Sequence, residues 1–264
     1  SSAASDVYKR QAPSAQSVQV DLGKKYEMTR DEKGDWTCTT EPQGPGFHYY
    51  FLFIDGVRVG DPSTEGFYGC SATASGIEIP YPEGVDQYYI ADVPHGEIRM
   101  KRYFSKTANA WRRMFVYTPP CYEKSGKKYP VLYLQHGGGE NEHGWPEQGK
   151  TGLIMDNLIA EGLAEEFIIV MDNGTWARPR PAQHPQAPAE GQSRPQGGRR
   201  APGMGLPSNW ADGFMNTLIN DIIPMVDSRY RTKADSKYRA MAGLSMGGMQ
   251  TKAITMKNPD VFSA

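Results

Sequence analysis

The pentapeptide Gly243-Leu244-Ser245-Met246-Gly247 matches G-x-S-x-G, a pattern in which the serine side chain acts as a nucleophile. The chemistry needs a sharp turn from a strand into a helix, because such a turn leaves the serine hydroxyl exposed. The sequence predicts that context, with a strand over 238–242 and a helix over 246–257. The flanking glycines leave room for tight backbone. The pentapeptide alone also fits a glycine-rich turn without a catalytic role. A second motif is therefore needed to distinguish a nucleophile from such a turn.

The run His136-Gly137-Gly138-Gly139 supplies that second signal, because it directly follows an apolar strand predicted over 129–134. A loop of this composition after such a strand forms half of an oxyanion hole, which stabilises the negative oxygen of a tetrahedral intermediate. We expect the backbone N–H groups of Met246 and Gly138 to be the two donors and Ser245 to be the nucleophile. The side chain of His136 is expected to order the loop. Together the two motifs predict a serine hydrolase.

A catalytic triad also needs a general base and an orienting acid, which follow the nucleophile in the order Ser, Asp or Glu, His. No histidine occurs among residues 246–264, and Asp260 comes too early, at the end of the first helix after the nucleophile. All five histidines lie upstream, and chain order argues against His143 as a substitute. We therefore expect the triad acid and histidine to be absent from this chain. It would then be a C-terminally truncated fragment, inactive as given.

Strands and helices alternate around these motifs, which predicts an α/β domain of three layers, α/β/α, with a mostly parallel sheet. Thr151 and Asp212 are candidate helix N-caps, and Pro224 is a candidate kink. Strands are expected over 97–104, 111–117, 129–134, 167–171 and 238–242, and helices over 151–163, 212–226 and 246–257.

The N-terminal part of the chain follows a different pattern, with short β-branched or aromatic runs between frequent turns. An aromatic run over 48–54, the tight-turn signal Asp55-Gly56 and an alternating run over 57–59 predict a β-hairpin. We therefore assign residues 18–94 to a small all-β sandwich and residues 95–264 to the α/β domain.

Two stretches are not expected to contribute to the core of either domain. Residues 1–17 are expected to be a disordered or artefactual start, because Ser1–Gln11 has no amphipathic period and resembles translated adapter sequence. Residues 177–209 are rich in Pro, Gly and Arg, which predicts a solvated surface insertion, with contact to an acidic polymer as the alternative.

Composition excludes several classes of partner. The 264 residues hold 29 basic and 30 acidic side chains, and the net charge of −1 gives no reason to expect nucleic acid or an anionic membrane. No apolar run approaches the roughly 18 residues that cross a bilayer.

Three cysteines without a C-x-x-C pair argue against a zinc site. We expect isolated, buried thiols, with a Cys38–Cys70 disulfide as the alternative. Neither a metal nor an organic cofactor is required.

The segments YPVLYLQHGGGENEHGW, MDNLIAEG, IIVMDNG and AGLSMGG resemble the family described as "Putative esterase", of carbohydrate esterase family 1 type. Its members include feruloyl and acetylxylan esterases. The upstream stretch from PGFHYYFLFIDG to VYTPPCY is similar to bacterial members with an N-terminal early-set, immunoglobulin-like module. The resemblance covers about residues 26–264. It implies an α/β-hydrolase domain, incomplete here, behind an immunoglobulin-like sandwich, and a secreted or periplasmic bacterial location. It also implies hydrolysis of feruloyl or acetyl esters of xylan through an acyl-enzyme on Ser245.

Three further residues are expected near the substrate. Trp145 closes the glycine loop, and it and Trp210 offer aromatic faces that suit ferulate and sugar rings, with core packing as the alternative. Asp172 ends a strand on the side where sites of open sheets form. The expected partner is plant cell-wall polysaccharide or its acylated oligosaccharides. The alternatives are a siderophore (enterochelin-type) esterase and a non-catalytic carbohydrate-binding protein with a vestigial hydrolase domain.

Overall fold

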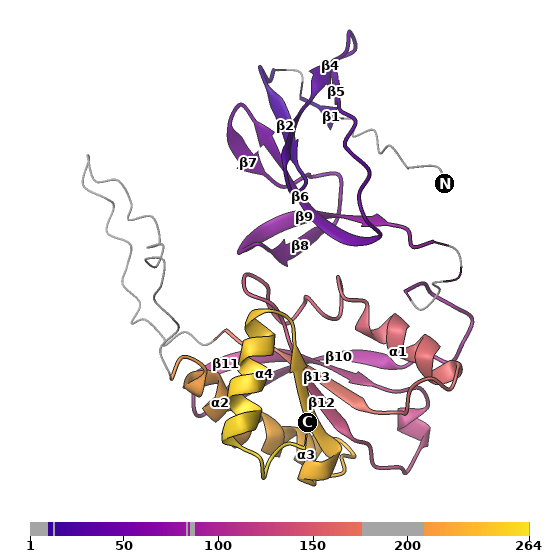
Figure 1. Ribbon diagram of the computed structural model, residues 1–264, viewed down its shortest axis with the longest axis vertical. Coiled ribbons are helices and arrows are strands. Elements are labelled where there is room, and N and C mark those ends of the chain that lie inside the picture. Colours follow the sequence, from indigo (N-terminus) through magenta and orange to yellow (C-terminus); the bar gives the residue numbers. More distant parts are fainter. Residues whose placement is uncertain (1–9, 13, 83, 85–87, 176–208, 264) are drawn as a thin grey trace, which may run out of the picture.

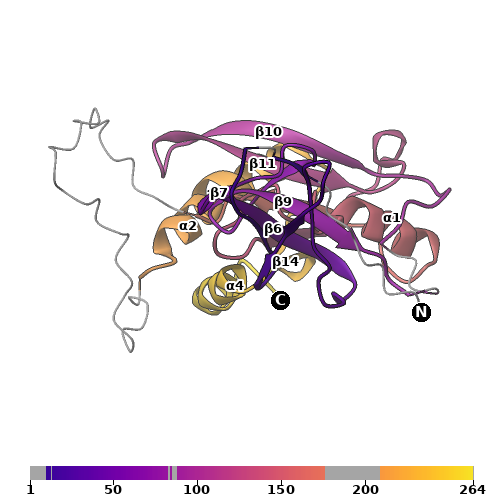
Figure 2. The ribbon, with the colours of Figure 1, turned by 90° about the horizontal axis from the view of Figure 1, so that it is seen from above.

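The fold is taken from a computed structural model that describes residues 10–12, 14–82, 84, 88–175 and 209–263. An N-terminal β module lies above one end of an α/β domain (Figure 1). Figure 2 looks down through that module onto the sheet of the domain. The insertion expected over 177–209 lies outside the described residues, except for Asn209.

Two antiparallel sheets form the N-terminal module. The smaller sheet has the strand order β1-β5-β4, and the larger has the order β3-β2-β6-β9-β8 with β7 paired to β6. This all-β organisation agrees with the short strands and frequent turns of the sequence. The strands are β1 (Arg10–Gln11), β2 (Val18–Asp21), β3 (Lys25–Glu27), β4 (Thr29–Arg30), β5 (Asp35–Thr37), β6 (Gly46–Ile54), β7 (Val57–Val59), β8 (Gly66–Gly69) and β9 (Ala72–Ile79).

The two sheets of the module share one apolar core. Trp36 of the smaller sheet and Val20, Tyr50 and Leu52 of the larger sheet are buried in a single cluster. Tyr50 also donates its hydroxyl to Oδ2 of Asp61 at 2.7 Å, so the polar end of this buried ring is satisfied.

The predicted β-hairpin is confirmed. Asp55 has φ 48° and Gly56 has φ 81°, so both turn residues occupy the left-handed region that this kind of hairpin turn requires. Val57 then pairs with Ile54, and β6 and β7 continue antiparallel from there.

The start of the chain contributes to this module as well. Arg10 and Gln11 belong to the start that we expected to be disordered or artefactual. They nevertheless form β1 and pair with Trp36 and Asp35 of β5. These two residues are therefore part of the smaller sheet.

The sheet of the α/β domain is mixed, but most of its strands run in one direction, which agrees with the prediction of a mostly parallel sheet. Its strands are β10 (Glu97–Ser105), β11 (Ala110–Thr118), β12 (Val131–Gln135), β13 (Ile168–Asp172) and β14 (Arg239–Gly243), in the order β10-β11-β13-β12-β14. The strands β10, β13, β12 and β14 run in one direction, and β11 runs opposite to them. A tight turn joins β10 to β11, and strands joined in that way can only be antiparallel.

Helices cover both faces of this sheet, so the three-layer prediction is confirmed. α1 (Thr151–Ala160) packs on one face with Ile169 and Met171 of β13. On the other face lie α2 (Asp212–Thr217), η2 (Leu218–Ile222), α3 (Ile223–Arg229) and α4 (Met246–Lys257), while η1 (Tyr122–Lys124) and η3 (Ser236–Tyr238) are single turns. Within the described ranges, no helix is both long and apolar enough to cross a bilayer.

Local differences from the predicted helices have simple causes. α4 has the predicted bounds, and the predicted kink at Pro224 appears as the π-helical turn η2 followed by a new helix. Proline has no N–H to continue the hydrogen-bond ladder. Thr151 and Asp212 are first helical residues rather than N-caps, which are Lys150 and Ala211. Thr151 instead donates its hydroxyl to the carbonyl of Trp145 at 2.7 Å.

The three cysteines are free, as expected, and the alternative of a Cys38–Cys70 disulfide is excluded in this structure. The expectation that they are buried was wrong. Cys70 and Cys121 are exposed and Cys38 is half-buried, because Cys70 and Cys121 both lie at turns with positive φ.

Candidate active site

Ser245 lies on a strained turn between β14 and α4. Its backbone has φ 51° and ψ −110°, a conformation that costs a residue with a Cβ about 1–3 kcal/mol. The side chain is exposed. The structure therefore holds Ser245 in the strand–turn–helix geometry that presents a nucleophile to substrate.

The glycines on both sides of Ser245 are required by close backbone packing. A Cβ on Gly243 would lie 2.4 Å from the carbonyl carbon of Gly247. A Cβ on Gly247 would lie 2.6 Å from the carbonyl oxygen of Gln135 and 2.7 Å from that of His136. Because all of these neighbours are backbone atoms, they cannot rotate away, and only glycine fits at either position.

Two backbone donors lie side by side next to the nucleophile. A Cβ on Gly138 would be 3.8 Å from Cβ of Met246, so the glycine loop reaches the first residue of α4. In the part of the chain that the structure describes, neither the N–H of Gly138 nor that of Met246 donates a hydrogen bond. Two free N–H groups beside Ser245, one of them at a helix N-terminus, are suited to stabilising an oxyanion.

The side chain of His136 links the glycine loop to Gly174 through two hydrogen bonds. Its Nε2 accepts the N–H of Gly174 at 3.1 Å, and its Nδ1 lies 2.7 Å from the carbonyl oxygen of Gly137. A backbone N–H can only donate, so Nε2 is the acceptor and Nδ1 carries the proton. The ring is buried and fully engaged, which agrees with its expected role in ordering the loop.

Glu140 fixes the loop from the other side. One carboxylate oxygen accepts the N–H of Gly137 at 3.1 Å, and the other accepts the hydroxyl of Tyr49 in β6 at 3.1 Å. The N–H of Ser71 also donates to the carbonyl of Gly139 at 2.9 Å. The N-terminal module therefore holds the loop that carries the free N–H of Gly138.

Sequence reasoning missed this connection. Glu140 directly follows the third glycine of the loop, so its position was a usable signal. Tyr49 and Ser71 gave no signal, because they are far from the loop in the chain and meet it only in the folded structure.

The predicted substrate-binding tryptophans differ in their surroundings. Trp145 packs in the core beneath α1 and donates its indole N–H to the carbonyl of Gln135 at 2.8 Å, so it braces the end of β12. Trp210 is half-buried just before α2. Within the described residues, no hydrogen bond or ring contact joins Trp210 to Ser245 or to the glycine loop.

Asp172 is only 1% exposed and lies at the end of β13. Its carboxylate accepts Nη2 of Arg112 at 2.8 Å and the hydroxyl of Tyr103 at 2.7 Å. Burial raises the pKa of Asp172, and the Arg112 guanidinium opposes that rise. The carboxylate is therefore too buried for the substrate contact that was expected of it. It holds the guanidinium group of Arg112 in place.

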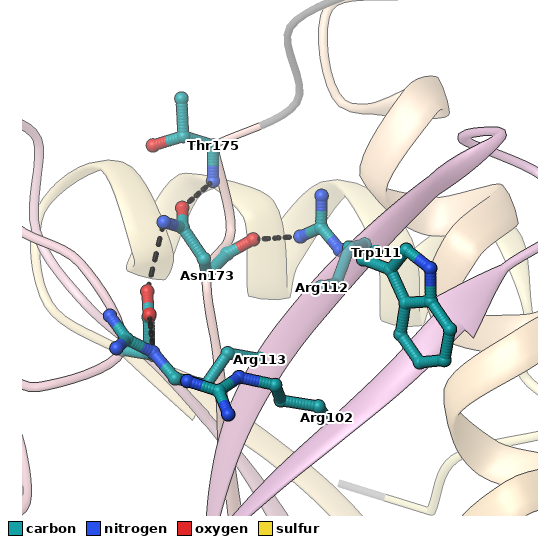
Figure 3. Close-up of a pocket in the computed structure, with 7 residues that line it drawn as sticks. Arg102, Trp111, Arg112, Arg113, Asn173 and Thr175 are labelled. Carbon is teal, nitrogen blue, oxygen red and sulfur yellow. Dashed lines mark hydrogen bonds and ion pairs between the residues drawn. The ribbon is translucent and has the colours of Figure 1, made fainter.

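A polar pocket of about 340 Å³ opens next to this buried pair (Figure 3). Glu142 lines it and accepts hydrogen bonds from Nε of Arg113 at 2.6 Å and from Nδ2 of Asn173 at 2.9 Å. The other lining residues are Arg102, Trp111, Arg112 and Thr175.

Among the described residues, no histidine hydrogen-bonds to Ser245. His48 contacts the carbonyl of Gly44, His95 pairs with Asp156, and His136 is held as above. His143 contacts Glu147 at 2.7 Å and packs edge-on against Phe115. The described residues thus supply an exposed serine and two free backbone N–H donors, and none of them hydrogen-bonds to Ser245 as a general base would. The same residues contain no group of three side chains able to hold a metal ion.

An exposed serine on a strained strand-to-helix turn of an α/β domain, beside two free backbone donors, is typical of the site of an α/β-hydrolase-type serine hydrolase. Comparison with known families narrows that class. The model of the family described as "Putative esterase" matches residues 105–264, and this chain belongs to that family.

Several characterised proteins are similar to this chain. An endo-1,4-beta-xylanase/feruloyl esterase of Xylanibacter ruminicola is 42% identical over 264 residues, covering 97% of this chain and 33% of the relative. The chain thus spans about a third of the length of that relative. A ferulic acid esterase of Anaeromyces mucronatus, solved with ferulic acid, has a TM-score of 0.52 and 27% identity, covering 67% of this chain and 60% of the other.

One further likeness concerns the fold alone. The enterobactin esterase of Shigella flexneri has a TM-score of 0.64 at 13% identity, and the match covers 96% of this chain and 67% of the other. The likeness therefore extends over the N-terminal module as well as the α/β domain.

Proposed function

We propose that this chain belongs to a serine carboxylic-ester hydrolase that cleaves acyl esters of plant cell-wall polysaccharide, with feruloyl or acetyl esters of xylan as the substrate class. The observation that carries the proposal is the exposed Ser245 beside the free N–H groups of Gly138 and Met246. The substrate class is supported by similarity to the Xylanibacter xylanase/feruloyl esterase and to the Anaeromyces ferulic acid esterase.

The chemistry follows from this geometry. Oγ of Ser245 attacks the ester carbonyl, and the N–H groups of Gly138 and Met246 stabilise the negative oxygen that forms. The sugar hydroxyl leaves with a proton, and an acyl-enzyme remains on Ser245. Water then attacks the acyl-enzyme and releases the acid. Both proton transfers need a general base, which in this fold follows the nucleophile after the acidic triad member.

We further propose an early-set, immunoglobulin-like character for the N-terminal module, with the module over 18–94 and the esterase domain over 95–264. Two antiparallel sheets around a common core support that view. A polymeric substrate that cannot enter a cell favours a secreted or periplasmic location. Trp145 and Trp210 stay predictions as aromatic faces toward the substrate.

The experiment adds the segment in which the triad order predicts the acid and the general base. Residues 1–264 are joined to the segment that follows the matched region in the Xylanibacter relative, because the triad order places the acid and histidine there. We expect this chimera to release ferulate from feruloylated arabinoxylan oligosaccharides, and we expect residues 1–264 alone to release far less. Ser245→Ala in the chimera should abolish the reaction.

Two results would contradict the proposal. Unchanged turnover in the folded Ser245→Ala chimera would remove Ser245 from the chemistry. Hydrolysis of a catecholate trilactone with no reaction on feruloylated or acetylated xylan would overturn the substrate class and favour a siderophore esterase. Circular dichroism of each variant establishes that the chimera is folded.

A further inference from the structure

Two side-chain pairs on one face of the β10–β11 hairpin form a patch that the proposed reaction does not use. Arg102 lies directly opposite Arg113, and Phe104 lies directly opposite Trp111. Residues opposite each other in an antiparallel pair share a face, and so do residues two apart in a strand. These four residues are called the hairpin patch below.

The arginine pair is electrostatically unfavourable without a further group. Like charges directly opposite each other in a sheet are destabilising. Glu142 offsets Arg113 through Nε at 2.6 Å, and its other oxygen is taken by Asn173. Arg102 makes no hydrogen bond or ion pair in the described part of the chain. The patch therefore carries an excess positive charge that an anionic ligand would offset.

The aromatic pair beside the arginines is unusually exposed. Trp111 is 73% exposed and Phe104 46% exposed, and their rings meet edge to face with centroids 5.8 Å apart. The contact with Phe104 leaves most of Trp111 open to solvent. An exposed indole face of this kind suits the apolar face of a sugar ring.

Three residues of the hairpin patch also line the polar pocket drawn in Figure 3. Arg102, Trp111 and Arg113 all line that pocket of about 340 Å³, which is near the lower limit for small-ligand sites. Arg112 lines the pocket as well, and the buried Asp172 balances the charge of Arg112. The excess charge of the pocket is therefore that of Arg102.

We propose that the hairpin patch binds a carboxylate-bearing sugar, a uronate side group of the polysaccharide. The sugar ring stacks on Trp111, and the carboxylate accepts hydrogen bonds from the guanidinium groups of Arg102 and Arg113. Guanidinium groups present paired N–H donors that match a carboxylate. A single excess charge beside one exposed indole matches one acidic sugar, whereas nucleic acid needs an extended basic surface. That the sugar belongs to xylan rests on the proposed function, whereas the ring-and-carboxylate chemistry does not.

Calorimetric titration of the protein tests the proposal without any turnover. The ligands are a glucuronate-substituted xylo-oligosaccharide, the unsubstituted xylo-oligosaccharide of the same length, and inorganic sulfate. We expect the acidic oligosaccharide to bind about tenfold more tightly than the neutral one. A difference in affinity of about this size is expected from one charge-assisted hydrogen-bonded contact. Arg102→Gln should remove that preference, and Trp111→Ala should weaken binding of both oligosaccharides.

Arg229→Gln is the matched control, because Arg229 is exposed in α3, away from the hairpin patch, and its variant should keep the preference. Equal affinity for the two oligosaccharides, or a preference that survives Arg102→Gln, overturns the proposal. Sulfate binding as tight as the acidic oligosaccharide also overturns it, because the patch would then recognise charge without sugar. Failure of the chimera to cleave feruloyl esters would leave the measured preference unchanged, so the two proposals fail separately.

Discussion

At the scale of single residues, Ser245 shows how the site stores strain. Its φ of 51° would suit glycine, yet the reaction needs a hydroxyl at this position. Gly243 and Gly247 let the neighbouring backbone pack so closely that the turn cannot relax. The strain at the nucleophile is therefore offset by the packing of β12, β14 and α4 around it.

We expect Ser245→Gly to raise the free energy of unfolding by about 1 kcal/mol, because glycine adopts this conformation without strain and the gain exceeds its extra unfolded-state entropy. Ser245→Ala is the matched control, because it also lacks the hydroxyl but keeps the Cβ and hence the strain. Urea denaturation of the two variants measures the difference. Equal stability of the two variants would show that the turn is not strained.

At the scale of elements, the N-terminal module acts on the oxyanion loop directly. Tyr49 of β6 reaches Glu140, and Ser71 of the β8–β9 turn reaches Gly139. Gln148 also donates to the hydroxyl of Tyr49 at 2.8 Å, so this ring is tied to two parts of the domain. The module is thus a structural support of the loop that carries the N–H of Gly138.

Tyr49→Phe removes the hydroxyl from Glu140 and keeps the ring. We expect the free energy of unfolding to fall by about 1 kcal/mol, since the lost hydrogen bond involves a carboxylate at a half-buried position. In the chimera, kcat should fall severalfold with little change in KM, because the loop is displaced at the oxyanion and not at the binding surface.

Tyr68→Phe is the control for that measurement, because Tyr68 lies in β8 near the same interface and is 41% exposed. It should alter neither stability nor kcat. A Tyr49→Phe chimera with unchanged kcat would show that the module supports the fold without supporting the oxyanion hole.

At the scale of the whole molecule, buried tyrosines make the stability of the fold depend on pH in the alkaline range. Burial raises the pKa of Tyr103, Tyr117 and Tyr133 well above the usual value, and it raises the pKa of Tyr230 to about 12. In the unfolded chain these hydroxyls ionise near pH 10. Above that pH the unfolded state binds fewer protons than the folded state, so stability falls as pH rises.

We therefore expect the urea midpoint to be steady below about pH 10 and to fall steeply above it. Absorbance at 295 nm should show these tyrosinates appearing together with unfolding. Tyr230→Phe removes one titrating group and should make the fall less steep. Ionisation of the buried tyrosines before any loss of ellipticity would contradict the prediction.

Much of the fold was predictable because its signals are local. The turn at Asp55-Gly56 depends on two residues, and the bounds of α4 follow from residues 246–257 alone. The mixed sheet was not predictable in the same way. An apolar run such as β13 looks the same beside a parallel or an antiparallel neighbour, and only the packing of β11 against it decided the direction.

The sequence by itself determined the chemistry that we propose, since the expected nucleophile and both expected oxyanion donors lie in two short motifs whose function depends on local backbone geometry. Tertiary structure alone decided what surrounds them. Glu140 meets Tyr49 across 91 positions in the chain, and Arg102 faces Arg113 only through the register of β10 and β11. Contacts of this kind arise from strand pairing and module docking, which are properties of the packed chain and of no single segment in it.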